Sequence, residues 1–209
     1  PALMGTKAID EVILGTVVEN VNVIPSEVNL AGAEIEIARM EDHLHGLNKI
    51  LEPIKQANIF DYIIIDCPPS LGILMSNALA AADSVIIPMQ CEYYAMEGLS
   101  VITQLIERLR STGVNPKLSL DGILMTMYNK TRLADEVISQ VREHYADTVF
   151  ETVIPRSVRA GEAPSYGLPV VVYSPSSTVA IGYSEFTKEF LKREKSKEII
   201  SNASDAPLP

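Results

Sequence analysis

Two kinds of apolar segment alternate along this chain, and the alternation restricts the folds that it can adopt. Short runs rich in β-branched residues indicate five strands, at Val21–Ile24, Tyr62–Ile65, Ser84–Ile87, Gly122–Met127 and Thr148–Ile154. Elsewhere apolar residues recur with the period of a helix, at Leu44, Leu47, Leu51 and Ile54, at Leu99, Ile102, Ile106 and Leu109, at Val137, Val141 and Tyr145, and at Val179, Tyr183, Phe186 and Phe190. Unalternating strand runs are typical of strands that are covered on both faces. The pattern therefore predicts an α/β fold, with a mostly parallel sheet and helices on both faces.

The charge balance argues against a broadly basic protein. The 17 Lys and Arg residues against 27 Asp and Glu give a net charge of −10, so any contact with nucleic acid must be a local basic patch. Cys67 and Cys91 cannot make a disulfide framework, and no Cys or His spacing resembles a zinc site, which favours a reducing cytoplasm. We expect neither a signal peptide nor a membrane span, because polar residues and a proline interrupt the most apolar stretch, Leu71–Met89.

The ends of the chain suggest its organisation. We expect a single α/β domain over residues 1–196 and a flexible polar tail over residues 197–209. The chain begins with Pro1, and the opening segment PALMGTKAID has none of the features of an N-terminal strand. We therefore expect that this chain is part of a longer protein.

The segment Phe60–Gly72, FDYIIIDCPPSLG, carries the clearest chemical signal. In it a buried strand run ends in Asp66, and open α/β sheets place their ligands at the carboxyl ends of their strands. In P-loop nucleotidases an acid at this position, the Walker B aspartate, holds a magnesium ion beside the β- and γ-phosphates. Taken alone, the run equally favours an aspartate that caps the following helix.

A longer stretch around this segment resembles the ParA/Soj family of partitioning ATPases, within the MinD/ParA superfamily. The matching residues are FDYIIIDCPPSLGILMSNALAAADSVIIPMQCEYYAMEGL from Phe60, VVENVNVIPSEVNLAGAEIE from Val17, LMTMYN from Leu124 and VFETVIPRSVRAGEAPSYGLPVVVY from Val149. The resemblance covers almost the whole chain. It implies a P-loop NTPase-like fold with a deviant Walker A loop, ATP and Mg²⁺ as cofactors, and an ATP-dependent homodimer. It further implies non-specific DNA binding, hydrolysis stimulated by a ParB-type partner, and a cytoplasmic, nucleoid-associated location.

The sequence departs from the family pattern in one respect. A Walker A loop reads G-x-x-x-x-G-K-[ST], and none of the 11 glycines here is followed by lysine. The resemblance therefore implies that the N-terminal P-loop portion is missing, with its phosphate cradle and signature lysine. We expect that this chain alone neither binds ATP tightly nor hydrolyses it.

The resemblance also assigns roles to individual residues. Asp66 matches the catalytic, magnesium-associated acid, which acts through water, and Cys67 is expected to be a small buried residue beside it. The residues that match loops around the adenine are Met127, Asn129, Ile154, Pro155, Arg156 and Ser157. Lys130 and Arg159 match DNA-contacting positions, and a few such cations suffice for non-specific binding. Ordinary loop packing and solvated surface charge are the alternative interpretations of these two groups.

Two local departures bear on the DNA-contacting positions. The stretch Tyr173–Tyr183, YSPSSTVAIGY, lacks arginines that family members often carry, and the match around Lys130 is one residue short.

Other functions remain open beside the partitioning ATPase. One is a natural, non-catalytic interaction module that is similar to ParA but lacks a P-loop. A MinD-like membrane-positioning ATPase is disfavoured because Lys192–Glu198 is charged all round and offers no apolar face to a membrane. An iron–sulfur relative is disfavoured because Cys67 and Cys91 do not match the required placement.

The resemblance predicts a defect in the sheet. In the family the strand that leads into the P-loop lies beside the strand that ends at the position of Asp66. Without it, Tyr62–Ile65 loses its hydrogen-bonded neighbour on one side. We therefore expect a gap or an abnormally exposed edge at Tyr62–Ile65.

Overall fold

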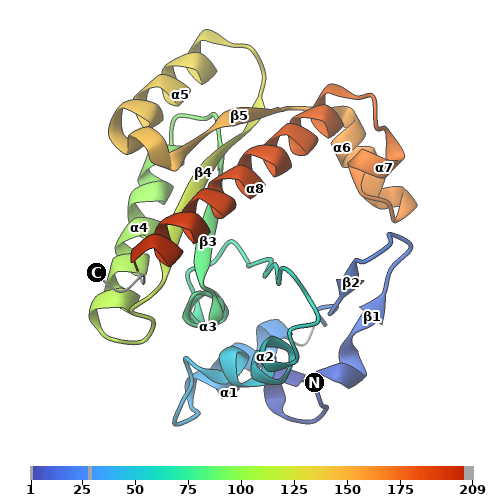
Figure 1. Cartoon of the computed structure of the whole chain (residues 1–209), viewed down its shortest axis with the longest axis vertical. Helices are drawn as coiled ribbons and strands as arrows, with labels where there is room; N and C mark the ends of the chain where they lie inside the picture. The colour runs from blue at the N-terminus through green and yellow to red at the C-terminus, as the bar shows by residue number, and fades with distance from the viewer. Residues whose placement is uncertain (1, 28–29, 205–209) are drawn as a thin grey trace. The chain divides into compact units, whose positions relative to one another are not determined.

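The computed structural model describes residues 2–27 and 30–204, which form two compact units (Figure 1). The first unit comprises the chain up to Val85 together with Gln104–Ser119, and the second comprises Ile86–Thr103 and the chain from Leu120 onward. Strand β3 (Ser84–Gln90) and helix α4 (Ala95–Ser111) each continue from one unit into the other. The single domain over residues 1–196 stays a prediction.

The second unit is built on a three-stranded sheet in the order β3-β4-β5. Strands β4 (Ser119–Tyr128) and β5 (Val149–Pro155) are parallel, with Ile123 opposite Val149 and Tyr128 opposite Pro155. The remaining elements are α5 (Arg132–Tyr145), η3 (Ala146–Thr148), α6 (Val158–Glu162), η4 (Ala163–Tyr166), α7 (Val170–Tyr173) and α8 (Thr178–Ser204). The predicted α/β class with parallel strands is confirmed.

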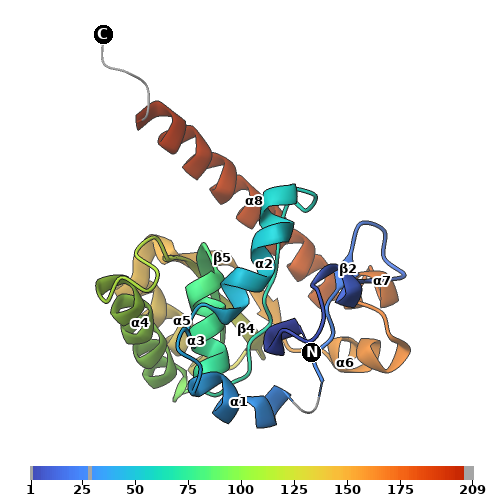
Figure 2. The same ribbon diagram turned by 90° about the horizontal axis from the view of Figure 1, so that it is seen from below.

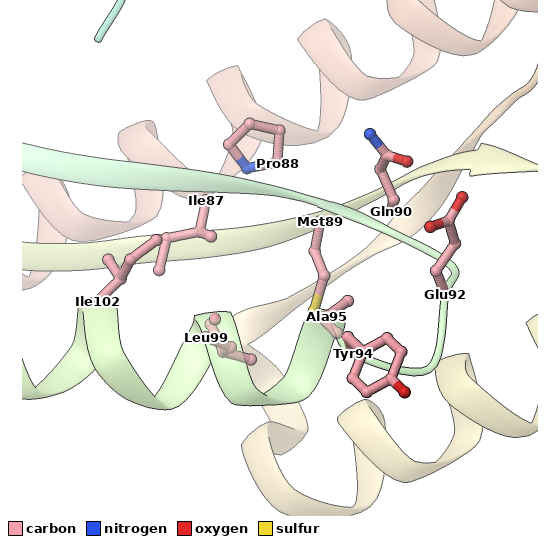
Figure 3. Close-up of a pocket in the computed structure, with 10 residues that line it drawn as sticks. Ile87, Pro88, Met89, Gln90, Glu92, Tyr94, Ala95, Leu99 and Ile102 are labelled. Carbon is pink, nitrogen blue, oxygen red and sulfur yellow. The ribbon is translucent and has the colours of Figure 1, made fainter. Parts of the chain in front are cut away.

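Helices pack on the sheet through the predicted apolar stripes. The core on the α8 side contains Leu124, Phe150, Ile154 and Val179, with Phe186 and Phe190 packed against it. On β3, Ile87 and Met89 point toward Leu99 and Ile102 of α4, while Pro88 and Gln90 point to the opposite side (Figure 3). The alternation along β3 explains why its run carries apolar residues at successive positions.

The first unit contains helices and one hairpin. Its elements are η1 (Ala2–Met4), η2 (Asp10–Val12), β1 (Leu14–Gly15), β2 (Asn22–Val23), α1 (Leu30–Ala38), α2 (Gly46–Ala57) and α3 (Ile73–Ala81). Buried Asn77 donates to the carbonyls of His43 and Ile73, at 2.6 and 3.0 Å, which ties α3 to the segment before α2. The predicted strand Val21–Ile24 is corrected, because only Asn22–Val23 is a strand, and it pairs antiparallel with β1.

The segment that precedes Asp66 forms no strand. Residues 62–68 are extended coil between α2 and α3 (Figures 1 and 2), and the side chain of Ile64 is 91% exposed. Ile63 is exposed as well. The run is rich in β-branched residues, yet none of the strands in the described part of the chain pairs with it. The predicted strand at Tyr62–Ile65 is wrong: Tyr62, Ile63 and Ile64 are exposed, but the segment belongs to no sheet and so forms no sheet edge.

Strand β5 is fixed to helix α8 by a carboxylate. Glu189 accepts the backbone N–H groups of Glu151 and Thr152, at 2.8 and 2.9 Å, and also the Thr152 hydroxyl. In a regular strand two consecutive N–H groups point to opposite sides, but here the register between β4 and β5 is irregular and both reach one carboxylate. Burial alone would raise the pKa of Glu189, yet these hydrogen bonds and the charge of Arg193 lower it below its ordinary value.

Arg193 completes the attachment one helical turn after Glu189. Its guanidinium donates to the carbonyls of Asp147 and Val149 and lies 4.2 Å from the centre of the Phe150 ring. Helix α8 continues to Ser204, beyond the expected domain end at residue 196, and Lys197 pairs with buried Asp121. Residues 205–209 of the expected tail lie outside the described residues. Within the described part of the chain, no helix is both long and apolar enough to cross a membrane.

Gly122 in β4 lies where no side chain fits. A Cβ atom added there would stand 2.3 Å from Phe150, a buried core residue. We predict that Gly122→Ala lowers the free energy of unfolding by about 1–3 kcal/mol, because the ring must leave its packed position. Chemical denaturation measures the change.

Gly98→Ala is the matched control, since Gly98 lies inside α4 with nothing within 4 Å of the added Cβ. It should stabilise the chain by up to about 1 kcal/mol through helix propensity. Equal stabilities of Gly122→Ala and the unmodified chain would contradict the close approach.

Candidate functional site

The carboxyl ends of β4 and β5 meet at one edge of the sheet. Tyr128 lies opposite Pro155, and the Arg156 N–H donates to the Tyr128 carbonyl at 2.9 Å. Adjacent parallel strands end at the same edge, which is where open α/β sheets bind ligands. The structure thereby brings together eight of the nine predicted site residues, namely Met127, Asn129, Lys130, Ile154, Pro155, Arg156, Ser157 and Arg159.

The end of β4 and the loop that follows it have an unusual backbone. Met127 and Lys130 adopt φ angles of 55° and 58°, in the left-handed region that non-glycine residues rarely occupy. Asn129 accepts a hydrogen bond from the Thr131 hydroxyl at 2.8 Å, and Thr131 caps α5 by accepting the Ala134 N–H. Conformations of this kind gather at ligand-binding segments. The geometry leaves Met127, Asn129 and Lys130 exposed at the sheet edge.

The loop after β5 leads directly into α6. The Ser157 hydroxyl caps this helix by accepting the Arg159 N–H at 3.2 Å. Ile154 is only 3% exposed and belongs to the core, so its backbone rather than its side chain is available to a ligand. Arg156 is exposed, and Pro155 is half-buried. The adenine-side assignments of these residues stay predictions.

Arg159 is held by a residue that the sequence analysis did not select. Its guanidinium lies 2.8 Å from the carboxylate of Glu162, three residues later in α6. The same carboxylate oxygen accepts the Tyr173 hydroxyl at 3.4 Å, and the Tyr173 ring stacks on Tyr166 with a centroid distance of 4.9 Å. The i, i+3 spacing of Arg159 and Glu162 could have predicted the ion pair, whereas the two tyrosines come from later elements and gave no local signal.

Asp66 is exposed and belongs to the first unit, whereas the other predicted site residues belong to the second. The helix-capping interpretation is wrong, because α3 begins at Ile73, its N-cap position is Gly72, and no side chain caps it. Within residues 2–27 and 30–204, no three His, Cys, Asp or Glu side chains gather in a way that could hold a metal ion. The described residues therefore do not by themselves form a magnesium site, and a single carboxylate at Asp66 would need further ligands.

Cys67 is half-buried, and its Sγ lies 3.6 Å from the Ile65 carbonyl. Burial raises the pKa of the Cys67 thiol, and the neighbouring negative charge of Asp66 raises it further. A raised pKa keeps the thiol protonated and weakly nucleophilic. Cys67 was expected to be a small buried residue, and the structure leaves it half-buried.

Two hollows in the second unit are lined by other residues. One, of about 350 Å³, lies between β3 and α4, and its lining is apolar apart from groups such as Gln90 and Glu92 (Figure 3). The other, of about 510 Å³, lies beside α5, where the Tyr128 hydroxyl donates to Asp135 and Arg142 donates to the Glu151 carbonyl. These polar groups at the second hollow are thus already hydrogen-bonded within the protein.

Comparison with known proteins identifies a family and relatives that this chain resembles. Residues 1–120 match the protein family described as AAA domain. The chain is 45% identical over 193 residues to the chromosome-partitioning ATPase Soj of Treponema pallidum, a match that covers 92% of this chain and 75% of that protein. It is 48% identical over 180 residues to the sporulation initiation inhibitor protein Soj of Bacillus subtilis, covering 86% and 70%.

A solved structure supports the same fold. The cobyrinic acid a,c-diamide synthase of Mycobacterium smegmatis, solved with a bound ATP analogue and magnesium, superposes with a TM-score of 0.77 at 32% identity. The match covers 94% of this chain and 72% of that one.

The proximity of Asp66 and Cys67 makes a chemical prediction. Asp66→Asn removes the negative charge that raises the pKa of the Cys67 thiol, so alkylation of Cys67 by iodoacetamide at mildly alkaline pH should become faster. The gain should stay below about tenfold, the effect of one full pKa unit, because burial persists. Mass spectrometry of the Cys67 peptide over time measures the rate.

Cys91 provides an internal control in the same digest. Burial and the charge of Asp135, rather than that of Asp66, raise the pKa of its thiol. An unchanged Cys67 rate, or equal acceleration at both cysteines, would contradict the local effect of Asp66.

Proposed function

Because the chain belongs to the Soj/ParA family of chromosome-partitioning ATPases, we propose that it acts in chromosome or plasmid partitioning. In this proposal ATP binding drives homodimerisation, the dimer binds DNA without sequence preference, and a ParB-type partner stimulates hydrolysis. The protein then works in the cytoplasm on the nucleoid. The observation that carries the proposal is 45% identity, across 92% of this chain, to a protein named as a chromosome-partitioning ATPase.

The proposed nucleotide contacts follow the residue assignments made from the sequence. Asp66 acts through water on a magnesium ion that accompanies ATP, and the ion supplies charge compensation to the phosphates when it is bound. The ends of β4 and β5 and the loops that follow them flank the adenine with Met127, Asn129 and the backbone of residues 154–157. Support comes from the joined ends of β4 and β5 and from the structurally similar synthase, which was solved with an ATP analogue and magnesium.

The sequence lacks a phosphate cradle, which limits the ATP binding that we propose for this chain alone. A triphosphate needs backbone amides and a lysine to balance its charge, and the sequence contains no G-x-x-x-x-G-K-[ST] motif. In the partitioning ATPase these groups come from residues outside this sequence. The second candidate is a natural, P-loop-less interaction module, favoured by the same absence. The reading frame upstream of Pro1 distinguishes the two, since a KGGVGKT-type loop in frame identifies the ATPase.

The nucleotide proposal predicts a difference between two forms of the protein. The 209-residue chain should bind a fluorescent ATP analogue more weakly than micromolar, whereas the protein from a complete reading frame with a P-loop should bind and hydrolyse ATP. There, Asp66→Ala should abolish hydrolysis and leave the melting transition unchanged, because Asp66 is exposed. Wild-type turnover in Asp66→Ala, or micromolar binding by the chain alone, would contradict this assignment.

The DNA proposal predicts a uniform loss of affinity. Lys130→Glu and Arg159→Glu should each weaken binding to unrelated duplexes about equally, because phosphate contacts carry no sequence information. Lys130→Glu should also reduce the slope of log K against log salt by about 1, and Arg159→Glu should reduce it by less, because the Arg159 guanidinium is already paired with Glu162. Fluorescence anisotropy over a salt series measures both quantities.

Lys49→Glu is the matched control, since Lys49 is an exposed cation of α2 in the first unit, paired with Asp42. It makes the same change in net charge at a position without a proposed DNA contact. If Lys49→Glu weakens binding as much as the other two variants, DNA contact at Lys130 and Arg159 is refuted.

A further inference from the structure

Glu162 already takes up part of the hydrogen-bonding capacity of the Arg159 guanidinium. The Arg159 side chain is 57% exposed and that of Glu162 is 39% exposed, so the pair lies at the surface and is open to solvent. Glu162 takes one guanidinium N–H with a single oxygen at 2.8 Å. A carboxylate and a phosphate present the same kind of acceptor to an arginine. Arg159 therefore reaches DNA from an existing ion pair rather than as a free cation.

Several contacts fix the positions of Glu162 and Arg159. The Tyr173 hydroxyl donates to the same Glu162 oxygen that Arg159 contacts, and the stacked Tyr166 ring holds Tyr173 in place. At the other end, the Ser157 cap fixes the backbone of Arg159 at the start of α6. The hydrogen bond to Glu162 raises the pKa of the Arg159 guanidinium, in keeping with a stable pair. Three elements, α6, η4 and α7, thus define one carboxylate position.

We propose that Glu162 is an internal competitor for the DNA phosphate at Arg159, and that it sets the strength and salt dependence of DNA binding. The inference rests on the proposed DNA contact of Arg159. A phosphate that reaches the guanidinium meets the negative charge of Glu162 beside it, so the carboxylate must turn away or be displaced. Because Glu162 offsets part of its positive charge, Arg159 neutralises less of a DNA phosphate. Fewer of the counterions condensed on the DNA are therefore released on binding. Arg159 then binds DNA only together with other cations such as Lys130.

Glu162→Gln tests the competition, since glutamine keeps the shape and can still accept the Tyr173 hydroxyl, but carries no charge. In the protein from the complete reading frame with ATP, this variant should bind duplexes of unrelated sequence about two- to fivefold more tightly, the range that exposed ion pairs support. The slope of log K against log salt should steepen by up to about 0.9. Fluorescence anisotropy over a salt series gives both quantities, and a thermal melt verifies folding.

Glu107→Gln is the matched control. Glu107 pairs with Arg110 at 3.4 Å, also three residues apart on an exposed helix surface, and belongs to the first unit. This variant makes the same change in net charge, and it should alter affinity less than Glu162→Gln does. Equal effects of the two variants would overturn the proposal, as would weaker binding by Glu162→Gln, which would indicate that Glu162 positions Arg159 for DNA.

A double variant locates the effect at Arg159. If Glu162 acts by competing for this guanidinium, Glu162→Gln should give little or no gain in an Arg159→Ala background. A full gain there would overturn the proposal. Failure of the underlying function is distinguishable, because then the unmodified protein binds no DNA, or Arg159→Ala binds as the unmodified protein does. If the unmodified protein binds through Arg159 and Glu162→Gln changes nothing, only the competition is refuted.

Discussion

The carboxylate of Glu189 holds the last strand of the sheet against the long C-terminal helix, and the site at the end of that strand depends on it. Strand β5 breaks its register with β4 and leaves two consecutive N–H groups in need of one acceptor. Glu189 supplies this acceptor, and Arg193 on the next turn takes two carbonyls and covers the Phe150 ring. The backbone polar groups of the irregular strand are thereby satisfied. The strand consequently ends at Pro155, opposite Tyr128, where the two loops meet.

The first unit contains an apolar run that is typical of a strand but has no strand partner among the described residues. Ile63 and Ile64 have the β-branched character of a buried strand, yet both are exposed, in a segment of coil. Asp66 follows directly and shares this exposure. An extended apolar segment of this type is a template for pairing with another strand. In the proposed function, the order of the Asp66 region thus depends on a strand that pairs with this run.

The immediate neighbours of each basic side chain decide how it can contact DNA on this acidic chain. With a net charge of −10, long-range attraction to DNA is absent, and individual side chains must provide it. Arg159 stands next to its own carboxylate, whereas Lys130 is placed by a left-handed backbone at the tip of the loop after β4. The two residues are therefore unlike in physical terms, although the sequence analysis treated them alike. In the proposed site Arg159 starts from an ion pair with Glu162, whereas Lys130 extends from an exposed loop.

The sequence by itself determined the fold class, the parallel strands and the helical stripes, because burial on two faces demands continuous apolar runs and a 3.6-residue period. It also determined the family. Tertiary structure decided what depends on residues far apart in the chain. Glu189 reaches β5 from α8, and Tyr173 reaches Glu162 from α7. The antiparallel pairing of Asn22–Val23 with Leu14–Gly15 is local by contrast, and a short β-run alone did not predict it because such a run adopts whichever partner its surroundings provide.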